Sequence, residues 1–398
     1  MFQKLKNYDF TLMITPILLS AFGIVMIYSA SMVTAVVVDE VESTYYLYKQ
    51  FQWFVIGLIG FILASIIPYQ FYQRIIKLMV LGSIILLIAV LFFGETAHNA
   101  TRSISIASVN IQPSEFVKLA IILYLASVYS KKQAYINEFS RGVLPPLILT
   151  GIMLSLIVLQ PDIGTSAIIF AIAFTIIMSS GIRFKHLFIL IMIGLILLAI
   201  AIPNMVTDTR ISRFTGAYQP FMAPEDGGYH LIQSYIAIGV GGLTGEGLGQ
   251  SVQKLGYLWG AHTDFIMSII AEELGFIGVI IVIGLLATIV LRGIFMARKC
   301  GDSFGSLLAI GISSMVGIQA FVNLGAISGI LPITGVPLPF VSYGGSSLLV
   351  MLIAMGILNN IARSVKEDDH HEQSHPQPTD KQKVSDLHTY RGGKTWLN

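Results

Sequence analysis

Long apolar runs divided by short polar segments dominate the sequence from residue 10 to residue 362. A helix needs roughly 20 consecutive, mainly apolar residues to cross the hydrocarbon core of a bilayer. The runs approach or exceed that length, so the pattern predicts an all-α integral membrane fold with about ten membrane-spanning helices. The predicted spans are residues 10–30, 51–68, 76–94, 112–129, 143–159, 164–181, 187–203, 264–291, 305–328 and 347–362.

The polar segments between these runs differ in length. Only Gln160, Pro161 and Asp162 separate the fifth and sixth spans, which predicts a tight helical hairpin. A long segment, about 203–260, joins spans seven and eight, and its apolar middle is suited to lie on the membrane surface or dip into it. Residues 365–398 are too polar to bury a core, so we expect a disordered tail after a single membrane domain, 1–364.

Lysine and arginine are distributed unevenly over the predicted loops, and short cytoplasmic loops of membrane proteins are enriched in these residues. With the N-terminus inside, fourteen of them lie inside: Lys4, Lys6, Arg74, Lys77, Lys131, Lys132, Arg141, Arg183, Lys185, Arg292, Arg298, Lys299, Arg363 and Lys366. Five lie outside: Lys49, Arg102, Arg210, Arg213 and Lys254. The asymmetry predicts a multi-pass protein of the cytoplasmic membrane with both termini cytoplasmic and the long segment outside.

Composition supports a membrane protein and excludes some partners. The chain is 55% hydrophobic and 12% charged, and its mean hydropathy is +0.77. The net charge is only +2, and the basic residues form no stripe, so we expect no nucleic-acid partner. Cys300 is the single cysteine, which excludes an intramolecular disulfide.

Charged residues at membrane depth or at the ends of spans are costly, so each is a candidate site residue. Glu115 and Lys118 are three residues apart and share a helix face, where they can neutralise each other or bind a substrate. Asp162 follows a proline at the predicted hairpin turn, where an aspartate often accepts hydrogen bonds from nearby backbone amides. For all three residues, a structural and a functional interpretation stay open.

Asp264 opens the eighth predicted span and has the most distinctive surroundings. As an N-cap, either Asp264 or Thr263 would only stabilise the helix start. His262 lies two residues away, however, and Arg210, Arg213 and Lys254 precede it in the long outer segment. A carboxylate among cations at the boundary of water and lipid suits a phosphate-bearing, lipid-linked substrate.

Two glycine-rich runs have simpler explanations. The run from 241 to 249 could bind phosphate oxygens through its backbone N–H groups, but without a flanking strand and helix this signal is weak, and a flexible loop is the favoured interpretation. The run from Ser342 to Ser347, with Gly344 and Gly345, fits a tight bend that opens the last span. The residues alone therefore predict a polar site at the outer membrane boundary, with its chemistry open.

Several longer motifs, in order, resemble those of the SEDS family (shape, elongation, division, sporulation), which includes the FtsW and RodA branches. The resemblance covers about 8–364. The matching segments are 25–31, 111–118, 159–165, 247–254, 261–266, 272–275 and 342–347. The short outer loop before the second span and the sequence Lys131-Lys132-Gln133 look more like the Gram-positive FtsW branch than like RodA.

The resemblance implies an inverting glycosyltransferase, a peptidoglycan polymerase that extends β-1,4 glycan strands from lipid II outside the membrane during septal cell-wall synthesis. Lipid II is a disaccharide-pentapeptide on undecaprenyl pyrophosphate. Asp264 matches the family's essential aspartate, which would act as general base on the acceptor 4-hydroxyl. The substrate-binding candidates are Arg210, Arg213, Lys254, Lys118, Glu115, Arg102, His262, Asp162, Ser342, Gly344 and Gly345.

The resemblance further implies a class B penicillin-binding protein, a transpeptidase, as partner, together with other division proteins. The motifs call for no certain cofactor, and a divalent cation at the pyrophosphate, magnesium or manganese, stays open. Ser103 departs from the family pattern, because many members carry a tryptophan there that would stack on a sugar ring. Two alternatives of other classes are a lipid II flippase, which would need charges along a mid-membrane path, and a non-catalytic scaffold of the division machinery.

Overall fold

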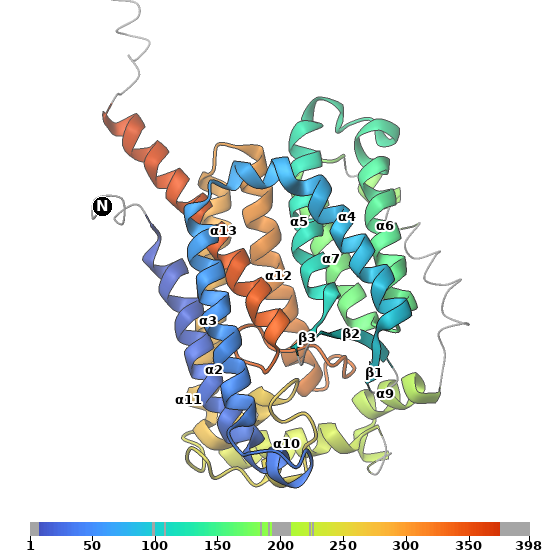
Figure 1. Ribbon diagram of the computed structural model, residues 1–398, viewed down its shortest axis with the longest axis vertical. Helices are drawn as coiled ribbons and strands as arrows, with labels where there is room; N and C mark the ends of the chain where they lie inside the picture. Colours follow the sequence, from blue (N-terminus) through green and yellow to red (C-terminus); the bar gives the residue numbers. More distant parts are fainter. Residues whose placement is uncertain are drawn as a thin grey trace, which may run out of the picture.

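The computed structural model describes residues 8–97, 100–106, 109–183, 185–189, 192, 208–222, 224 and 227–374. The described chain is a bundle of long helices with a small sheet and short helices at one end (Figure 1). Seven of the described helices are long and apolar enough to cross a membrane. They are α2 (Phe10–Val37), α3 (Tyr45–Ile66), α4 (Tyr69–Phe93), α6 (Leu144–Leu159, continuous with the π-turn η2, Phe139–Val143), α11 (Ile266–Lys299), α12 (Ser303–Ile327) and α13 (Gly345–Ser374).

The remaining described helices are shorter or less apolar. They are α5 (Pro113–Lys131), α7 (Ile163–Ser179), α9 (Asp208–Tyr218), α10 (Tyr229–Gly241), and the turns η1 (Gln133–Tyr135), η3 (Pro220–Met222) and η4 (Gln253–Leu255). Each predicted span except the seventh coincides with a described helix. The seventh, 187–203, lies almost entirely outside the described residues.

Aspartates fix the start of three helices by accepting hydrogen bonds from backbone N–H groups that have no partner within the helix. Asp9 caps α2 through the amides of Thr11 and Leu12, and Asp302 caps α12 in the same way. Asp162 accepts from the amide of Thr165 and so begins α7. The predicted tight hairpin between α6 and α7 is therefore confirmed, with Asp162 as its cap.

A three-stranded antiparallel sheet lies between α4 and α5, which the predicted all-α fold did not include. Its strands are β1 (Glu95–Ala97), β2 (Ala100–Ile106) and β3 (Val109–Ile111), in the order β1-β2-β3. Ser105 of β2 pairs with Asn110 of β3. The strands are too short for a period-two pattern to stand out beside the long apolar runs.

Both ends of the described chain lie at one end of the bundle, and α9, α10 and the sheet lie at the other, here termed the site end (Figure 1). Lys366 donates to the carbonyl of Tyr8 (2.9 Å) and lies 3.8 Å from the Asp9 carboxylate, which also pairs with Arg292. Helix α13 continues to Ser374, so the predicted boundary of the disordered tail at residue 365 is too early. Residues 375–398 lie outside the described residues.

Helix α11 is interrupted at Gly275, whose φ of 64° lies in the left-handed region that favours glycine. The glycine-rich run packs into this break, and a Cβ on Gly275 would collide with the backbone of Leu243 and Gly245. The amide of Phe276 donates to the carbonyl of Gly242 (2.9 Å), and the amide of Gly247 donates to the carbonyl of Glu273 (3.0 Å). The predicted flexible loop is therefore wrong, because the run is held by backbone hydrogen bonds to α11. These bonds replace the helical ones that are missing at Gly275.

Candidate functional site

A cavity of about 610 Å³ opens at the site end, and Asp264 is one of the residues that line it. Four segments form it: the first turns of α3, the β2–β3 hairpin, the residues just before α11, and the α12–α13 connection with the first turn of α13. We call it the Asp264 cavity. Gly344 and Gly345, both predicted as site residues, also line it.

Asp264 is not a helix cap. Helix α11 begins at Ile266, and Phe265 occupies the N-cap position without a side-chain capping bond. The Asp264 carboxylate instead accepts a hydrogen bond from the hydroxyl of Thr263, with 2.7 Å between Oδ1 and Oγ1. A carboxylate that faces a cavity and accepts one side-chain hydrogen bond retains lone pairs for a substrate proton.

Arg102 of β2 brings a positive charge close to this carboxylate. A Cβ on Gly335 would lie 3.8 Å from Asp264 Oδ2 and 3.9 Å from Arg102 Nη1, so both groups lie close to this glycine. Arg102 Nη1 also lies 3.8 Å from Asp162 Oδ1. The Arg102 side chain is 29% exposed, so part of this guanidinium, which carries five N–H donors, is open to an anion.

The first turns of α3 supply cavity residues that the sequence analysis missed. Lys49 and Trp53 line the Asp264 cavity, and Lys49 also lies over the ring of Tyr45. A Cβ on Gly345 would collide with the Trp53 indole, so a glycine there lets the indole approach the start of α13. The polar residues clustered at the start of this otherwise apolar span were the available sequence signal. Ser103, where family members often carry a tryptophan, lines the cavity as well.

His262 is packed between aromatic rings. Its ring centroid lies 4.6 Å from that of Tyr46 and 5.7 Å from that of Tyr343. Burial lowers the pKa of His262 to about 4, although Asp39 opposes the shift. The imidazole is therefore neutral at pH 7, and it cannot act there as a cation for phosphate.

Ser342 and the Glu115–Lys118 pair are buried near the cavity but do not line it. The Ser342 hydroxyl donates to the carbonyl of Thr263 and accepts from the amide of Leu338. It therefore links the chain segment before α11 to the α12–α13 connection. Lys118 Nζ lies 2.8 Å from Glu115 Oε2, and both side chains are buried. The predicted pairing on one helix face is confirmed, and the structure places this pair inside the bundle, not in the cavity wall.

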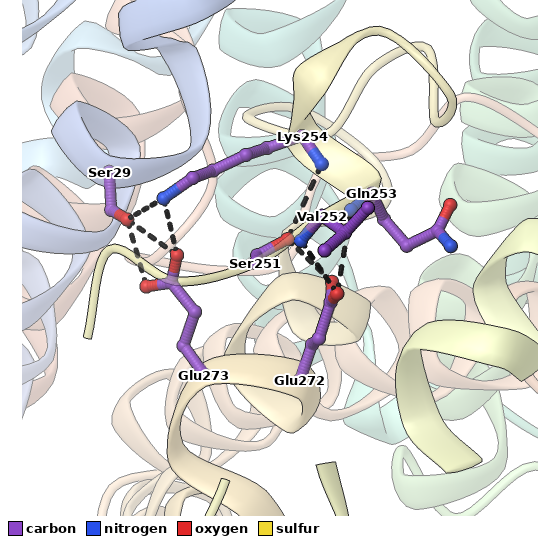
Figure 2. Close-up of polar contacts among 7 residues, drawn as sticks. All are labelled: Ser29, Ser251, Val252, Gln253, Lys254, Glu272 and Glu273. Carbon is purple, nitrogen blue, oxygen red and sulfur yellow. Dashed lines mark hydrogen bonds and ion pairs between the residues drawn. The ribbon is translucent and has the colours of Figure 1, made fainter. Parts of the chain in front are cut away.

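Lys254 lies in a second polar cluster, the Lys254 cluster, formed by Ser29, Ser251, Lys254, Glu272 and Glu273 (Figure 2). Lys254 Nζ lies 2.7 Å from Glu273 Oε1 and 3.0 Å from Ser29 Oγ, and its side chain is only 2% exposed. Glu272 accepts from the Ser251 hydroxyl and from the amide of Val252 at 2.8 Å. The structure thus gives Lys254 a buried carboxylate partner in place of the expected position beside Asp264.

Two further arginines that the sequence places outside are described only in part. Arg210 and Arg213 belong to α9 at the site end, and their side chains lie outside the described residues. Across the ranges that the structure describes, no group of three or more His, Cys, Asp or Glu side chains could hold a metal ion. Of the predicted site residues, the structure brings Asp264, Arg102, Gly344 and Gly345 together directly.

These features define a polytopic membrane protein with a carboxylate and a lysine in the wall of a polar cavity at one end of its helix bundle, and an arginine close by. The model of the FtsW, RodA and SpoVE family, described as cell cycle proteins, matches residues 10–367. The chain belongs to this family, and the predicted SEDS membership is confirmed.

Individual relatives support the same assignment. The chain is 47% identical over 383 residues to the probable peptidoglycan glycosyltransferase FtsW of Bacillus subtilis, covering 94% of this chain and 95% of the relative. It is 39% identical to the stage V sporulation protein E of the same organism, covering 91% and 99% of the two chains. The FtsW relative, with its higher identity, favours the FtsW branch, as the sequence predicted.

Solved structures show the same fold. The rod shape determining protein RodA of Thermus thermophilus superposes with a TM-score of 0.66 at 26% identity and covers 90% of this chain and 97% of its own. A chain of a peptidoglycan synthase complex, described as coordinating polymerization and crosslinking, superposes with a TM-score of 0.73 at 25% identity, covering 90% and 98%. The membrane fold is therefore that of the SEDS proteins.

Proposed function

We propose that this protein is a peptidoglycan glycosyltransferase that polymerises lipid II into β-1,4 glycan strands during septal cell-wall synthesis. The observation that carries the proposal is the Asp264 carboxylate in the wall of a cavity, with Arg102 close to the same glycine, Gly335. The chain is 47% identical to a relative named as a probable peptidoglycan glycosyltransferase.

In the proposed reaction, the acceptor 4-hydroxyl attacks the anomeric carbon of the donor sugar. A new C–O bond forms on the face opposite the leaving group, and the bond to the pyrophosphate oxygen breaks, so the configuration inverts. Asp264 takes the hydroxyl proton, and the undecaprenyl pyrophosphate leaves with the bonding electron pair. Proton transfer to a positioned carboxylate contributes about 10²–10⁴-fold to such reactions.

Arg102 is the cation best placed to stabilise the departing pyrophosphate. Its side chain is 29% exposed, and its guanidinium lies close to Gly335, as the Asp264 carboxylate does. Charge-assisted hydrogen bonds to phosphate are about twice as strong as neutral ones. Lys49, in the wall of the same cavity, adds a second positive charge. Arg210 and Arg213 remain candidates from the sequence.

The proposal includes a location and partners. The site end lies outside the cytoplasmic membrane and both termini lie in the cytoplasm, as the fourteen-to-five distribution of lysine and arginine favours. A class B penicillin-binding protein cross-links the strands within the division machinery, by analogy with the synthase complex of similar fold. A divalent cation at the pyrophosphate would need phosphate oxygens among its ligands, because no described cluster of three acidic, histidine or cysteine side chains is placed to hold it.

The decisive experiment is polymerisation of lipid II by the purified full-length protein, alone and with a class B penicillin-binding protein, compared with Asp264→Asn. We expect glycan strands from the unmodified protein and none from the variant. A lipid II flippase would move substrate across vesicles without forming strands, and a scaffold would support growth with Asp264→Asn. Either result would replace the glycosyltransferase proposal.

A further inference from the structure

Two buried amide side chains project from α12 toward the back of the Asp264 cavity. Gln319 and Asn323 are four residues apart, so they share one helix face, and both are at most 1% exposed. A buried amide within a membrane-spanning helix is costly unless its polar atoms find partners. The partners of these two side chains are therefore informative about their role.

Asn323 joins the backbone of Asp264 to the α12–α13 connection. Its Nδ2 donates to the carbonyl of Asp264 and to the carbonyl of Val336, each at 2.8 Å. Its Oδ1 is buried and has no hydrogen-bond partner among the described residues. Both bonds therefore use the donor end of the amide, and an aspartate at this position would turn a negative oxygen toward two carbonyl oxygens.

The α12–α13 connection needs such anchors because residues 332–338 belong to no helix or strand. Gln319 supplies a second one, since its Nε2 donates to the carbonyl of Pro337 at 3.0 Å. Its Oε1 accepts from Lys118 Nζ at 2.6 Å, and Lys118 pairs with Glu115. The buried ion pair is thus linked through Gln319 to the chain that carries Gly335 and Pro337 into the cavity wall.

We propose that Asn323 is a positioning residue for Asp264. Its two hydrogen bonds fix the distance between the Asp264 backbone and the connection that carries Gly335, the glycine near which the carboxylate and Arg102 both lie. Asn323 touches no substrate and acts through Asp264. The inference rests on the proposed function, because its consequence is a correctly placed general base. A misplacement of about 1 Å can cost about a hundredfold in rate.

The test compares Asn323→Ala with a matched buried asparagine. Asn360 accepts from the amide of Tyr69 at 2.9 Å and donates to the carbonyl of Ser65 at 2.7 Å, where α3 ends and α4 begins. Steady-state lipid II polymerisation and thermal unfolding are measured for Asn323→Ala, Asn323→Asp and Asn360→Ala in the full-length purified protein.

We expect both alanine variants to lower the midpoint of thermal unfolding by a similar amount, because each leaves two buried backbone groups without a partner. Asn323→Ala should also lower kcat by about ten- to a hundredfold with less than about a threefold change in KM, and Asn323→Asp should lower it further. Asn360→Ala should keep the kcat of the unmodified protein per folded molecule.

Equal kcat values for Asn323→Ala and Asn360→Ala would overturn the inference and leave Asn323 as a structural residue. A loss confined to KM would also overturn it, because a misplaced base slows the chemical step. Asp264→Asn in the same assay separates the two proposals. If that variant is inactive while Asn323→Ala keeps its kcat, only the positioning role fails. If Asp264→Asn is active, the proposed function itself fails.

Discussion

A carboxylate stands at each end of the first half of α11, and the two carboxylates have different surroundings. Asp264 stands just before the helix, in the wall of a cavity, and accepts one side-chain hydrogen bond from Thr263. Glu273 stands just before the break at Gly275, is 0% exposed, and is held by Lys254 and Ser29. One carboxylate is open to a substrate, whereas the other is sealed with its partners.

This difference shows how the chain holds its reactive group in place. The Lys254–Glu273 pair joins two points of the chain, and Asp264 lies about midway between them along the sequence. A buried ion pair of this kind contributes little net stability compared with an apolar pair, yet removing one partner is strongly destabilising. We therefore interpret the Lys254 cluster as a structural cluster that holds the two chain segments together, and the Asp264 cavity as the reactive region.

The largest expected effect separates activity from stability at the two carboxylates. Asp264→Asn should reduce lipid II polymerisation by about a hundredfold or more, because the amide cannot accept the proton. It should change the free energy of unfolding by less than about 1 kcal/mol, since the side chain accepts a single hydrogen bond from a neighbour. Thermal unfolding and the polymerisation assay measure both quantities.

Glu273→Gln is the matched variant at the other end of the half-helix, and it should show the opposite pattern. The substitution leaves Lys254 buried without its charge partner, so the unfolding midpoint should drop clearly. If Asp264→Asn proved the more destabilising of the two, the assignment of reactive and structural regions would be reversed.

The second effect concerns Lys254 directly. Lys254→Met should cost about 3–5 kcal/mol of stability, because it leaves Glu273 charged and buried. The double variant Lys254→Met, Glu273→Gln removes both charges and should recover most of the stability and the activity. A lysine that held the lipid pyrophosphate would give another result, namely a double variant that is stable but at least tenfold less active.

The third effect tests Arg102, the cation proposed to stabilise the pyrophosphate. Arg102→Ala removes a charge-assisted contact worth about 1.5–3 kcal/mol, so lipid II polymerisation should fall about ten- to a hundredfold. Arg141→Ala is the control, because its side chain is 76% exposed and pairs only loosely with Glu138 at 3.5 Å. That control should change the rate by less than about threefold. Equal rates in the two variants would leave Arg210 and Arg213 as the next candidates.

The sequence predicted the long helices well because apolar runs of membrane length have few alternatives in a bilayer. It also predicted the hairpin at Asp162, the bend before α13 and Asp264 as a candidate site residue, since each combines a turn residue or a charge with the end of a span. It did not predict the β1–β3 sheet, whose strands are only three to seven residues long.

The site was predictable only in part, because the sequence shows which charges share an end of the bundle but not which of them are buried. In the sequence, Lys254 and Arg102 look equivalent as outer cations. In the structure, Lys254 is buried against Glu273, whereas Arg102 is partly exposed, lies 3.8 Å from Asp162 and is close to Gly335. The partners come from chain segments far apart in sequence, such as Ser29 for Lys254 and Asn323 for Asp264. Those pairings depend on tertiary packing, which periodicity does not reveal.

The smallest expected effect appears only at acidic pH and concerns His262, which packs between Tyr46 and Tyr343. Burial holds the pKa of His262 at about 4, below its ordinary value of 6.5, so the unfolded chain binds a proton more readily than the folded one. The stability that neutral His262 provides is therefore complete above pH 6.5 and is lost as the pH falls toward 4. At pH 5 the loss is up to about 2 kcal/mol.

His262→Phe keeps a ring between Tyr46 and Tyr343 and removes the titration. Its unfolding midpoint should match that of the unmodified protein at pH 7.5 and should fall less between pH 6.5 and pH 4.5, while its polymerisation rate at pH 7.5 should change by less than about threefold. If the variant lost stability in acid as much as the unmodified protein does, the group that titrates would be a residue other than His262. A large loss of polymerisation at pH 7.5 would instead place the imidazole among the groups of the Asp264 cavity that act on the substrate, and the boundary between reactive and structural regions would have to include it.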